Sequence, residues 1–324
     1  MAFEAGFVVA LALLVAGAGF VKGNIASQVG GLYQEHDTLR RADAFQIFLL
    51  AVNAGVIAAP LVCGALGEKI GWSYGFGAAG VGMVIGLSIY LAGHKFLPPD
   101  RPRATAANAP RETLSRKDWL AIAALLALLP ILAVVFVGNN QINAYLVWAK
   151  DNADLAILGW NMPVTWLLSF DAAVSTGFLA FGVFFWHWMA ARKIVPHELT
   201  KIALGSAVSI LGFLILALAA FLQGQGKASL ALLVSFHVVN TIGFVCILPV
   251  AMSLFARTAP RQVNATMIGV FYLFFFATNL MVGWIGGLYE KMSHVDFWLL
   301  HAGLCAASTA AIAVLYRPLK SVLA

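Results

Sequence analysis

The chain has 324 residues, of which 61% are hydrophobic and 10% are charged, and its mean hydropathy is +0.88. This composition is typical of an all-α protein that crosses a membrane several times, and it excludes a soluble domain with a large core. Lysine and arginine exceed aspartate and glutamate by six charges. No basic run is interleaved with base-stacking aromatic residues, so a nucleic-acid partner is not expected. Cys63, Cys246 and Cys305 lie in apolar segments and predict small buried side chains, with no disulfide or metal site.

Nine apolar stretches are long enough to form membrane-spanning helices, each of which needs about 20 residues. They lie near residues 5–29, 45–66, 74–97, 118–149, 160–190, 200–223, 228–256, 263–289 and 296–316. If the chain starts outside, fifteen Lys and Arg residues fall in the inner loops and four in the outer loops. This bias predicts a multi-pass protein of the cytoplasmic (inner) membrane with a cytoplasmic C-terminus.

Residues 7–29 form the apolar run FVVALALLVAGAGFVKGNIASQV, and Lys22 is the only charged residue in it. An ammonium group in hydrocarbon is costly unless it faces a partner or a watery cavity, which indicates a functional site. The alternative is that the Lys22 side chain reaches toward the nearer membrane face.

The longest polar linker, residues 98–117, divides the chain into three spans and then six. We expect a three-helix end of an N-terminal bundle at 1–97, a cytoplasmic linker at 98–117 and a six-helix C-terminal bundle at 118–324. Met1 opens almost directly into a span that runs inward. This start predicts that three further helices precede the chain in a complete 6 + 6 version.

Five segments carry motifs in a fixed order: GAGFVKGNIASQVGGLY, FQIFLLAVNAG, NMPVTWLLSFDA, NTIGFVCILPVAMSLFARTAP and MIGVFYLFFFATNLMVGWIGGLY. In this order they resemble the proton-coupled oligopeptide transporter (POT/PTR) family of the major facilitator superfamily, from its fourth helix onward. The first resembles G-x-G-x-x-K-P-N-[IV]-S, with Gly23 at the proline. The second resembles F-x-x-F-Y-x-x-I-N-x-G, with Asn53 matching and Leu49 at the tyrosine.

The resemblance implies a major-facilitator-type helical bundle that holds di- or tripeptides in a central cavity. Alternating access would be coupled to inward proton flow. Lys22 would then meet the peptide carboxylate or an acidic partner, and Asn53 would hydrogen-bond the peptide backbone. Small peptides, protons and the lipid bilayer are the partners that follow from this reading.

The chain departs from the family pattern at its acidic positions. Asn139 stands at the seventh-helix glutamate and Phe244 at the tenth-helix glutamate, while Asp171 stands at the eighth-helix asparagine. The family's E-x-x-E-R motif belongs to a first helix that this chain does not contain. Proton coupling needs a titratable group, and the candidates are therefore Lys22, Asp171 and His237.

Each candidate also has a structural interpretation. Asp171 could pair with Ser169 or Ser175, and His237 is typical of a hydrogen-bonded histidine in helix packing. Asn139 and Gln141 belong to an amide cluster that lines a cavity or bonds across helices, and Asn53 could join helices in the same way. Phe271 falls at the aromatic position of the eleventh helix, within an aromatic-rich run that favours packing.

We therefore expect a secondary active transporter that imports di- or tripeptides by proton symport, with substrate contacts from Lys22, Asn53, Asn139, Gln141, Asp171, Phe244 and Phe271. The alternatives are a truncated or inactive remnant and a proton-independent or non-peptide transporter. An enzyme is not expected, because the spans contain no HExxH, no DDxxD and no Ser/His/Asp set, and no cofactor is predicted.

Overall fold

The computed structural model describes residues 2–32, 38–97, 114–140, 142–157, 159–224, 226–260 and 262–323. Within these ranges, the description leaves out the side chains of residues 2–5, 21–24, 26–27, 30–31, 38–43, 45–46 and 265. The chain forms two compact units, Met1–Asn108 and Ala109–Ala324. Most of the expected linker, residues 98–113, falls outside the described residues.

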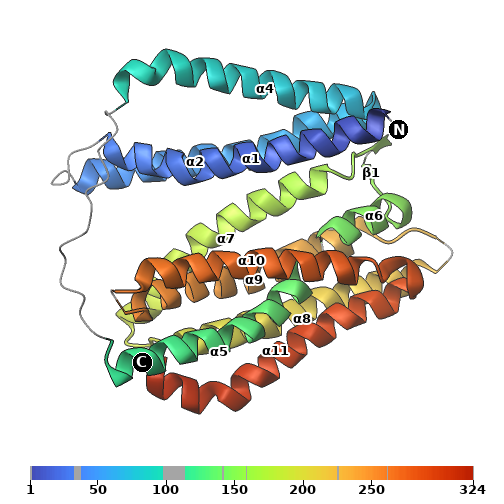
Figure 1. The fold of residues 1–324 in the computed structure, drawn as a ribbon. Helices are drawn as coiled ribbons and strands as arrows, with labels where there is room; N and C mark the ends of the chain where they lie inside the picture. Colours follow the sequence, from blue (N-terminus) through green and yellow to red (C-terminus); the bar gives the residue numbers. More distant parts are fainter. Residues whose placement is uncertain are drawn as a thin grey trace. The chain divides into compact units, whose positions relative to one another are not determined.

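The first unit contains three long helices (Figure 1): α1 (Ala2–Gly31), α2 (Thr38–Ala59) and α4 (Trp72–Gly93). Between α2 and α4 the chain widens into a π-helical turn, Pro60–Gly64, and then forms the short α3 (Ala65–Lys69). The proline explains the turn, because it has no amide hydrogen and its ring clashes with the carbonyl four residues earlier. A short 3₁₀ turn, His94–Phe96, follows α4.

Glycine permits the tight return from α3 to α4. Gly71 has φ +154° and ψ +148°, a backbone region that is essentially open only to glycine. A Cβ atom on Gly75 would lie 2.6 Å from the carbonyl oxygen of Cys63, so α4 packs against the π turn where only glycine fits.

The second unit contains the remaining helices: α5 (Arg116–Asn139), α6 (Ile142–Asn152), α7 (Trp166–Ala191), α8 (Glu198–Gln223), α9 (Leu230–Thr258), α10 (Asn264–Gly286) and α11 (His294–Leu323), with a 3₁₀ turn at Tyr289–Lys291. A capping box starts α5: Ser115 Oγ accepts a hydrogen bond from the Asp118 amide (3.3 Å), and the Asp118 carboxylate accepts one from the Ser115 amide (2.7 Å).

Two elements in this unit differ from the expected spans. The stretch expected at 118–149 is two helices, because α5 ends at Asn139 and Asn140 has the non-helical angles φ −107° and ψ 52°. Asparagine side chains compete with the helical backbone for hydrogen bonds, which favours a break at this point. The stretch expected from residue 160 begins with a hairpin of β1 (Ala156–Ile157) and β2 (Trp160–Asn161), and Gly159 in its turn has φ +80°.

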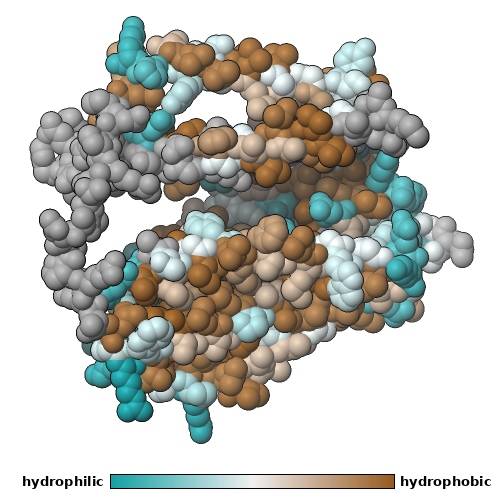
Figure 2. Space-filling view, in the orientation of Figure 1, coloured by the Kyte–Doolittle hydropathy of each residue, from teal (hydrophilic) through white to brown (hydrophobic). Residues whose placement is uncertain are grey.

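Among the residues that the structure describes, eight helical segments are long and apolar enough to cross a membrane. The described part of α1 adds a shorter apolar stretch, Gly6–Phe20. Together these segments cover the nine predicted spans. Figure 2 shows hydrophobic residues over the visible flank of the second unit, as expected for a surface that faces lipid. Apolar side chains of α8 such as Leu211 and Phe221 are also exposed.

The core of the second unit lies among α5, α8, α9 and α11. Leu125, Leu128 and Leu132 project from α5 and are fully buried. Helices α8 and α9 approach most tightly at two glycines: a Cβ on Gly205 would lie 2.7 Å from the Gly243 carbonyl oxygen. Small residues at such crossings let two helix backbones come into close contact. In a membrane this packing holds helices together, because lipid is as apolar as the side chains and gives no hydrophobic driving force for association.

Candidate functional site

The second unit contains a partly enclosed polar cavity of about 240 Å³. Its walls come from α5, α6, α7, α9 and α10 and from the break between α5 and α6. The lining residues are Phe136, Asn139, Asn140, Ile142, Asp171, Ser175, Asn240, Thr241, Phe244 and Phe275. Amide, hydroxyl, carboxylate and aromatic groups therefore face one space.

Asn139 joins three helices at one wall of this cavity. Its Nδ2 donates to Ser209 Oγ on α8 (2.8 Å) and to Asn240 Oδ1 on α9 (2.8 Å). The sequence left open whether the amide cluster lines a cavity or bonds across helices, and Asn139 does both. Because both amide hydrogens are used, its Oδ1 is the atom best placed to accept a hydrogen bond from a ligand.

Asp171 and His237 form a hydrogen-bonded chain with Tyr145. His237 Nδ1 lies 2.8 Å from Asp171 Oδ1, and His237 Nε2 lies 3.0 Å from the Tyr145 hydroxyl. The three residues come from α7, α9 and α6, so the chain also links these helices. A neutral imidazole satisfies all three groups if Nδ1–H donates to the carboxylate and Nε2 accepts from the hydroxyl.

Burial divides this chain into an inner and an outer end. His237 and Tyr145 are almost completely buried, whereas 36% of the Asp171 side chain is exposed. Aromatic rings surround the imidazole, with the Phe170 centroid 5.8 Å and the Phe236 centroid 5.3 Å away. Asp171 is therefore the member that a solute in the cavity can reach, and His237 supports it from behind.

The other predicted site residues fall in different places. Phe244 lines the cavity, whereas Phe271 is 1% exposed and packs against Phe255 with ring centroids 4.9 Å apart. Asn53 is in the first unit, where its Nδ2 donates to the Leu49 carbonyl on its own helix (3.0 Å). Lys22 lies on α1 but its side chain is not described, and Gln141 is outside the described residues.

The sequence reasoning missed the partners of these groups. Ser209, Asn240 and Tyr145 complete the two polar networks. Asn240 carried a usable signal, because it lies three residues after His237 and four before Phe244 and so shares a face of α9 with both. Tyr145 and Ser209 carried none, because single polar residues of these types are common in membrane helices.

The arrangement of spans around a polar cavity defines a multi-pass helical membrane protein. The structure is similar to a crystal structure of a mutant of the peptide transporter POT in complex with sulfate, with a TM-score of 0.86 and 21% sequence identity. The similarity covers 98% of this chain and 76% of that chain. The major-facilitator-type bundle that the sequence predicts is confirmed.

The family comparison agrees with the fold. Residues 4–114 match the family model PTR2, described as the POT family. The chain is 25% identical over 350 residues to the uncharacterized transporter YclF of Bacillus subtilis (strain 168), which covers 90% of this chain and 70% of that protein. It is also 25% identical over 362 residues to the peptide transporter YePEPT of Yersinia enterocolitica, with 90% and 69% covered. The resemblance to the POT family is thereby confirmed, and these relatives are transporters.

Proposed function

We propose that this chain is a secondary active transporter that imports di- or tripeptides across the cytoplasmic membrane by alternating access. The observation that carries the proposal is the cavity in which the Asn139 amide, the Asp171 carboxylate and the Phe244 ring face the same space. A peptide zwitterion needs an anion for its amino group, a cation for its carboxylate and amide-complementary groups between them. Asp171 and Asn139 supply the first and third of these.

The cation is assigned to Lys22, and a further amide contact to Asn53, on the resemblance to the POT family. Both residues belong to the first unit, on α1 and α2. Gln141 adds a further amide to the same proposed site. The peptide relatives support the substrate class, since one is named a peptide transporter and another a di-/tripeptide transporter.

Proton coupling is assigned to Asp171 and His237. A proton that enters from the cavity reaches the Asp171 carboxylate first, because this side chain is the exposed end of the chain. Protonation removes the negative charge that would hold the peptide amine, so proton and peptide occupancy are linked at one group. The Lys22 ammonium is the third titratable candidate.

A non-peptide or proton-independent transporter is the second candidate function. It is favoured by Phe244, which presents an aromatic ring to the cavity at a position where the family resemblance expects a glutamate. Losing that acid predicts a lower demand for a free amino group on the substrate. Competition between labelled dialanine and either free or N-acetylated dipeptides measures this demand. Equal inhibition by the two supports a low demand for the free amine, and a strong preference for the free amine contradicts it.

The direct test is dialanine or trialanine uptake into proteoliposomes, with and without an inward-acid pH gradient. Asp171→Asn and Lys22→Ala are the test variants, and Asp154→Asn in an extramembrane loop is the matched control. Uptake that a gradient stimulates and that both test variants abolish supports the proposal. Uptake indifferent to pH retains the peptide site without symport, and no uptake from well-folded protein indicates an inactive remnant.

A further inference from the structure

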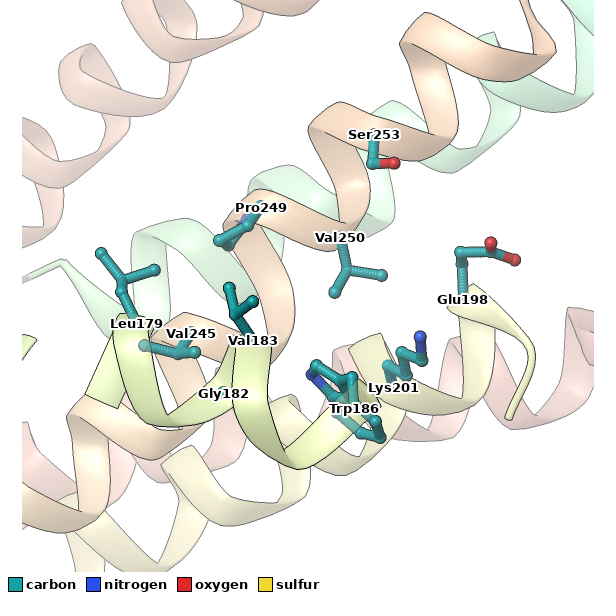
Figure 3. Close-up of a pocket in the computed structure, with 10 residues that line it drawn as sticks. All are labelled: Leu179, Gly182, Val183, Trp186, Glu198, Lys201, Val245, Pro249, Val250 and Ser253. Carbon is teal, nitrogen blue, oxygen red and sulfur yellow. The ribbon is translucent and has the colours of Figure 1, made fainter. Parts of the chain in front are cut away.

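A second pocket, of about 180 Å³, lies among α7, α8 and α9, apart from the polar cavity (Figure 3). Its lining residues are Leu179, Gly182, Val183, Trp186, Glu198, Lys201, Val245, Pro249, Val250 and Ser253. Neither the transport reaction nor the family resemblance assigns a role to it.

The lining changes from apolar to polar along the helix axes. Figure 3 shows Leu179, Val245 and Val183 at one side of the pocket and Lys201 and Glu198 at the other. The polar side is the one nearest the helix ends, because α7 ends at Ala191, α8 begins at Glu198 and α9 ends at Thr258. From Val245 to Ser253 the pocket spans about 12 Å of helix, at 1.5 Å per residue.

The charged residues that line the polar side are Glu198 and Lys201. Glu198 is paired with Arg257, whose Nη2 lies 3.2 Å from its Oε1, so its charge is compensated. Lys201 lies over the Trp186 ring, with Nζ 4.5 Å from the centroid, and among the described residues it makes no ion pair with a carboxylate. Arg192 stacks on Trp188 at 3.6 Å near the end of α7. An ammonium with no carboxylate partner among the described residues, an acid already paired with Arg257 and a further cation nearby together favour an anionic ligand.

We propose that this pocket binds one anionic phospholipid of the leaflet at which α7 and α9 end. Its phosphate lies against Lys201 and the Ser253 hydroxyl, and one acyl chain follows the apolar wall beside Val183 and Val245. The pocket matches a phospholipid along its length: polar groups at the helix ends face the headgroup, and apolar groups deeper in the membrane face the acyl chain. A soluble anion would leave the apolar wall unused.

The basic loops identify the leaflet. Lys193 and Lys201 flank the connection between α7 and α8, and Arg257 closes α9. All three belong to the fifteen Lys and Arg residues of the inner loops, whose excess predicts the cytoplasmic side. Anionic lipids give that leaflet its negative surface potential, so the site and its ligand occur on the same side. The inference does not depend on the proposed transport activity.

The binding test uses tryptophan fluorescence of the protein in phosphatidylcholine vesicles that contain increasing fractions of dibrominated phosphatidylglycerol. Bromine atoms in an acyl chain beside Trp186 quench its emission. We expect a saturable component at low phosphatidylglycerol fraction that Trp186→Phe removes and that dibrominated phosphatidylcholine does not produce. Quenching that rises only in proportion to the brominated lipid, or that Trp186→Phe leaves intact, overturns the proposal.

Two lysine variants separate a site from general surface charge. Lys201→Gln is expected to raise the half-saturating phosphatidylglycerol fraction by about fivefold. Lys193→Gln removes the same charge from an exposed turn at the same membrane face, and because Lys193 does not line the pocket it should raise that fraction clearly less. Equal effects of the two variants mean that Lys201 only reaches toward the membrane surface, and they overturn the proposal.

Two further measurements distinguish a lipid from a free phosphate. Val183 is 60% exposed, so Val183→Phe leaves the fold intact while narrowing the apolar wall. It should weaken the saturable component, and unchanged binding overturns the acyl-chain contact. Inorganic phosphate should not displace the brominated lipid, and displacement by phosphate overturns the assignment of a lipid as the ligand.

Discussion

Gly243→Ala tests the contact between α8 and α9 on which the polar cavity depends. A Cβ atom at this position would lie 2.8 Å from the Gly205 carbonyl oxygen and 3.2 Å from the Ser209 amide nitrogen, and closer still to Ser209 Oγ. Two of these three atoms belong to the backbone of α8, so no side-chain rotation relieves the clash. The two helices must move apart.

The size of the effect follows from these distances. Non-bonded heavy atoms have their optimum at about 3.5–4.0 Å, so the Cβ atom and the Gly205 carbonyl oxygen, 2.8 Å apart, must separate by at least about 0.7 Å. Overpacking of this kind costs about 1–3 kcal/mol. Displacing Ser209 also weakens the hydrogen bond from Asn139, which adds about 1 kcal/mol. Alanine regains about 0.5–1 kcal/mol from its better helix propensity.

The net destabilisation is therefore about 2 kcal/mol, which lowers the Tm of a unit of this size by about 4–8 °C. Thermal unfolding of the purified protein in detergent, followed by circular dichroism, measures the difference. Gly303→Ala on α11 is the matched control, because no heavy atom lies within 4 Å of its added Cβ. If Gly243→Ala melts with the wild type, or if both variants lose the same Tm, the close approach of α8 and α9 at Gly243 is refuted.

Three further changes probe single contacts. Tyr145→Phe leaves His237 Nε2 buried without its hydrogen-bond partner and should lower the free energy of unfolding by about 1–3 kcal/mol. Tyr272→Phe, on an exposed ring, is the control and should hardly change it. Equal Tm values for the two variants would contradict the hydrogen-bonded chain. Ser206→Ala removes the buried bond to the Cys305 carbonyl (2.9 Å) and should cost about 1 kcal/mol in the same assay, and an unchanged Tm would argue against that bond. Burial lowers the pKa of His197; the Lys320 and Arg257 charges lower it further, and the Glu198 charge opposes them. His197 caps the start of α8, because its Nδ1 accepts a hydrogen bond from the Leu199 amide. Nδ1 must therefore stay unprotonated for the cap to form. Because the unfolded chain binds this proton more readily than the folded chain, the stability that neutral His197 contributes is present above pH of about 6.5 and is lost as the pH falls toward the lower pKa of the folded state. His197→Asn keeps a capping acceptor that does not titrate, so its Tm should fall less than that of the wild type between pH 7.5 and pH 5.5. An equal fall in both proteins would contradict the capping role of His197.

Composition and hydropathy were sufficient to predict the spans, because a bilayer requires about 20 apolar residues per helix whatever packs against them. The break after Asn139 and the hairpin before α7 were not predicted. Both lie inside apolar runs, and both depend on backbone angles at single residues, Asn140 and Gly159. Hydropathy averages over a window and does not report such angles.

The candidate site was predicted residue by residue but not as a set of contacts. Asp171 and His237 stood out because charged and titratable groups are expensive in a membrane. Their pairing joins residues 66 positions apart in the chain, so it depends on the register of α7 against α9, which no local pattern specifies. The partners that the sequence offered for Asp171, Ser169 and Ser175, lie on its own helix, whereas the hydrogen bond to His237 crosses from α7 to α9.

Three of the positions at which the second unit departs from the family pattern line a single cavity. Asn139, Asp171 and Phe244 all line the same cavity, although they come from α5, α7 and α9. Two positions where the resemblance expects a glutamate carry an amide and a phenyl ring, and one where it expects an asparagine carries a carboxylate. The cavity thus keeps an anionic group on a different wall, where His237 holds it from behind. An anion at a different place around a ligand changes which end of the ligand it can meet. We therefore propose that substrate choice and proton coupling of the proposed transporter both depend on Asp171.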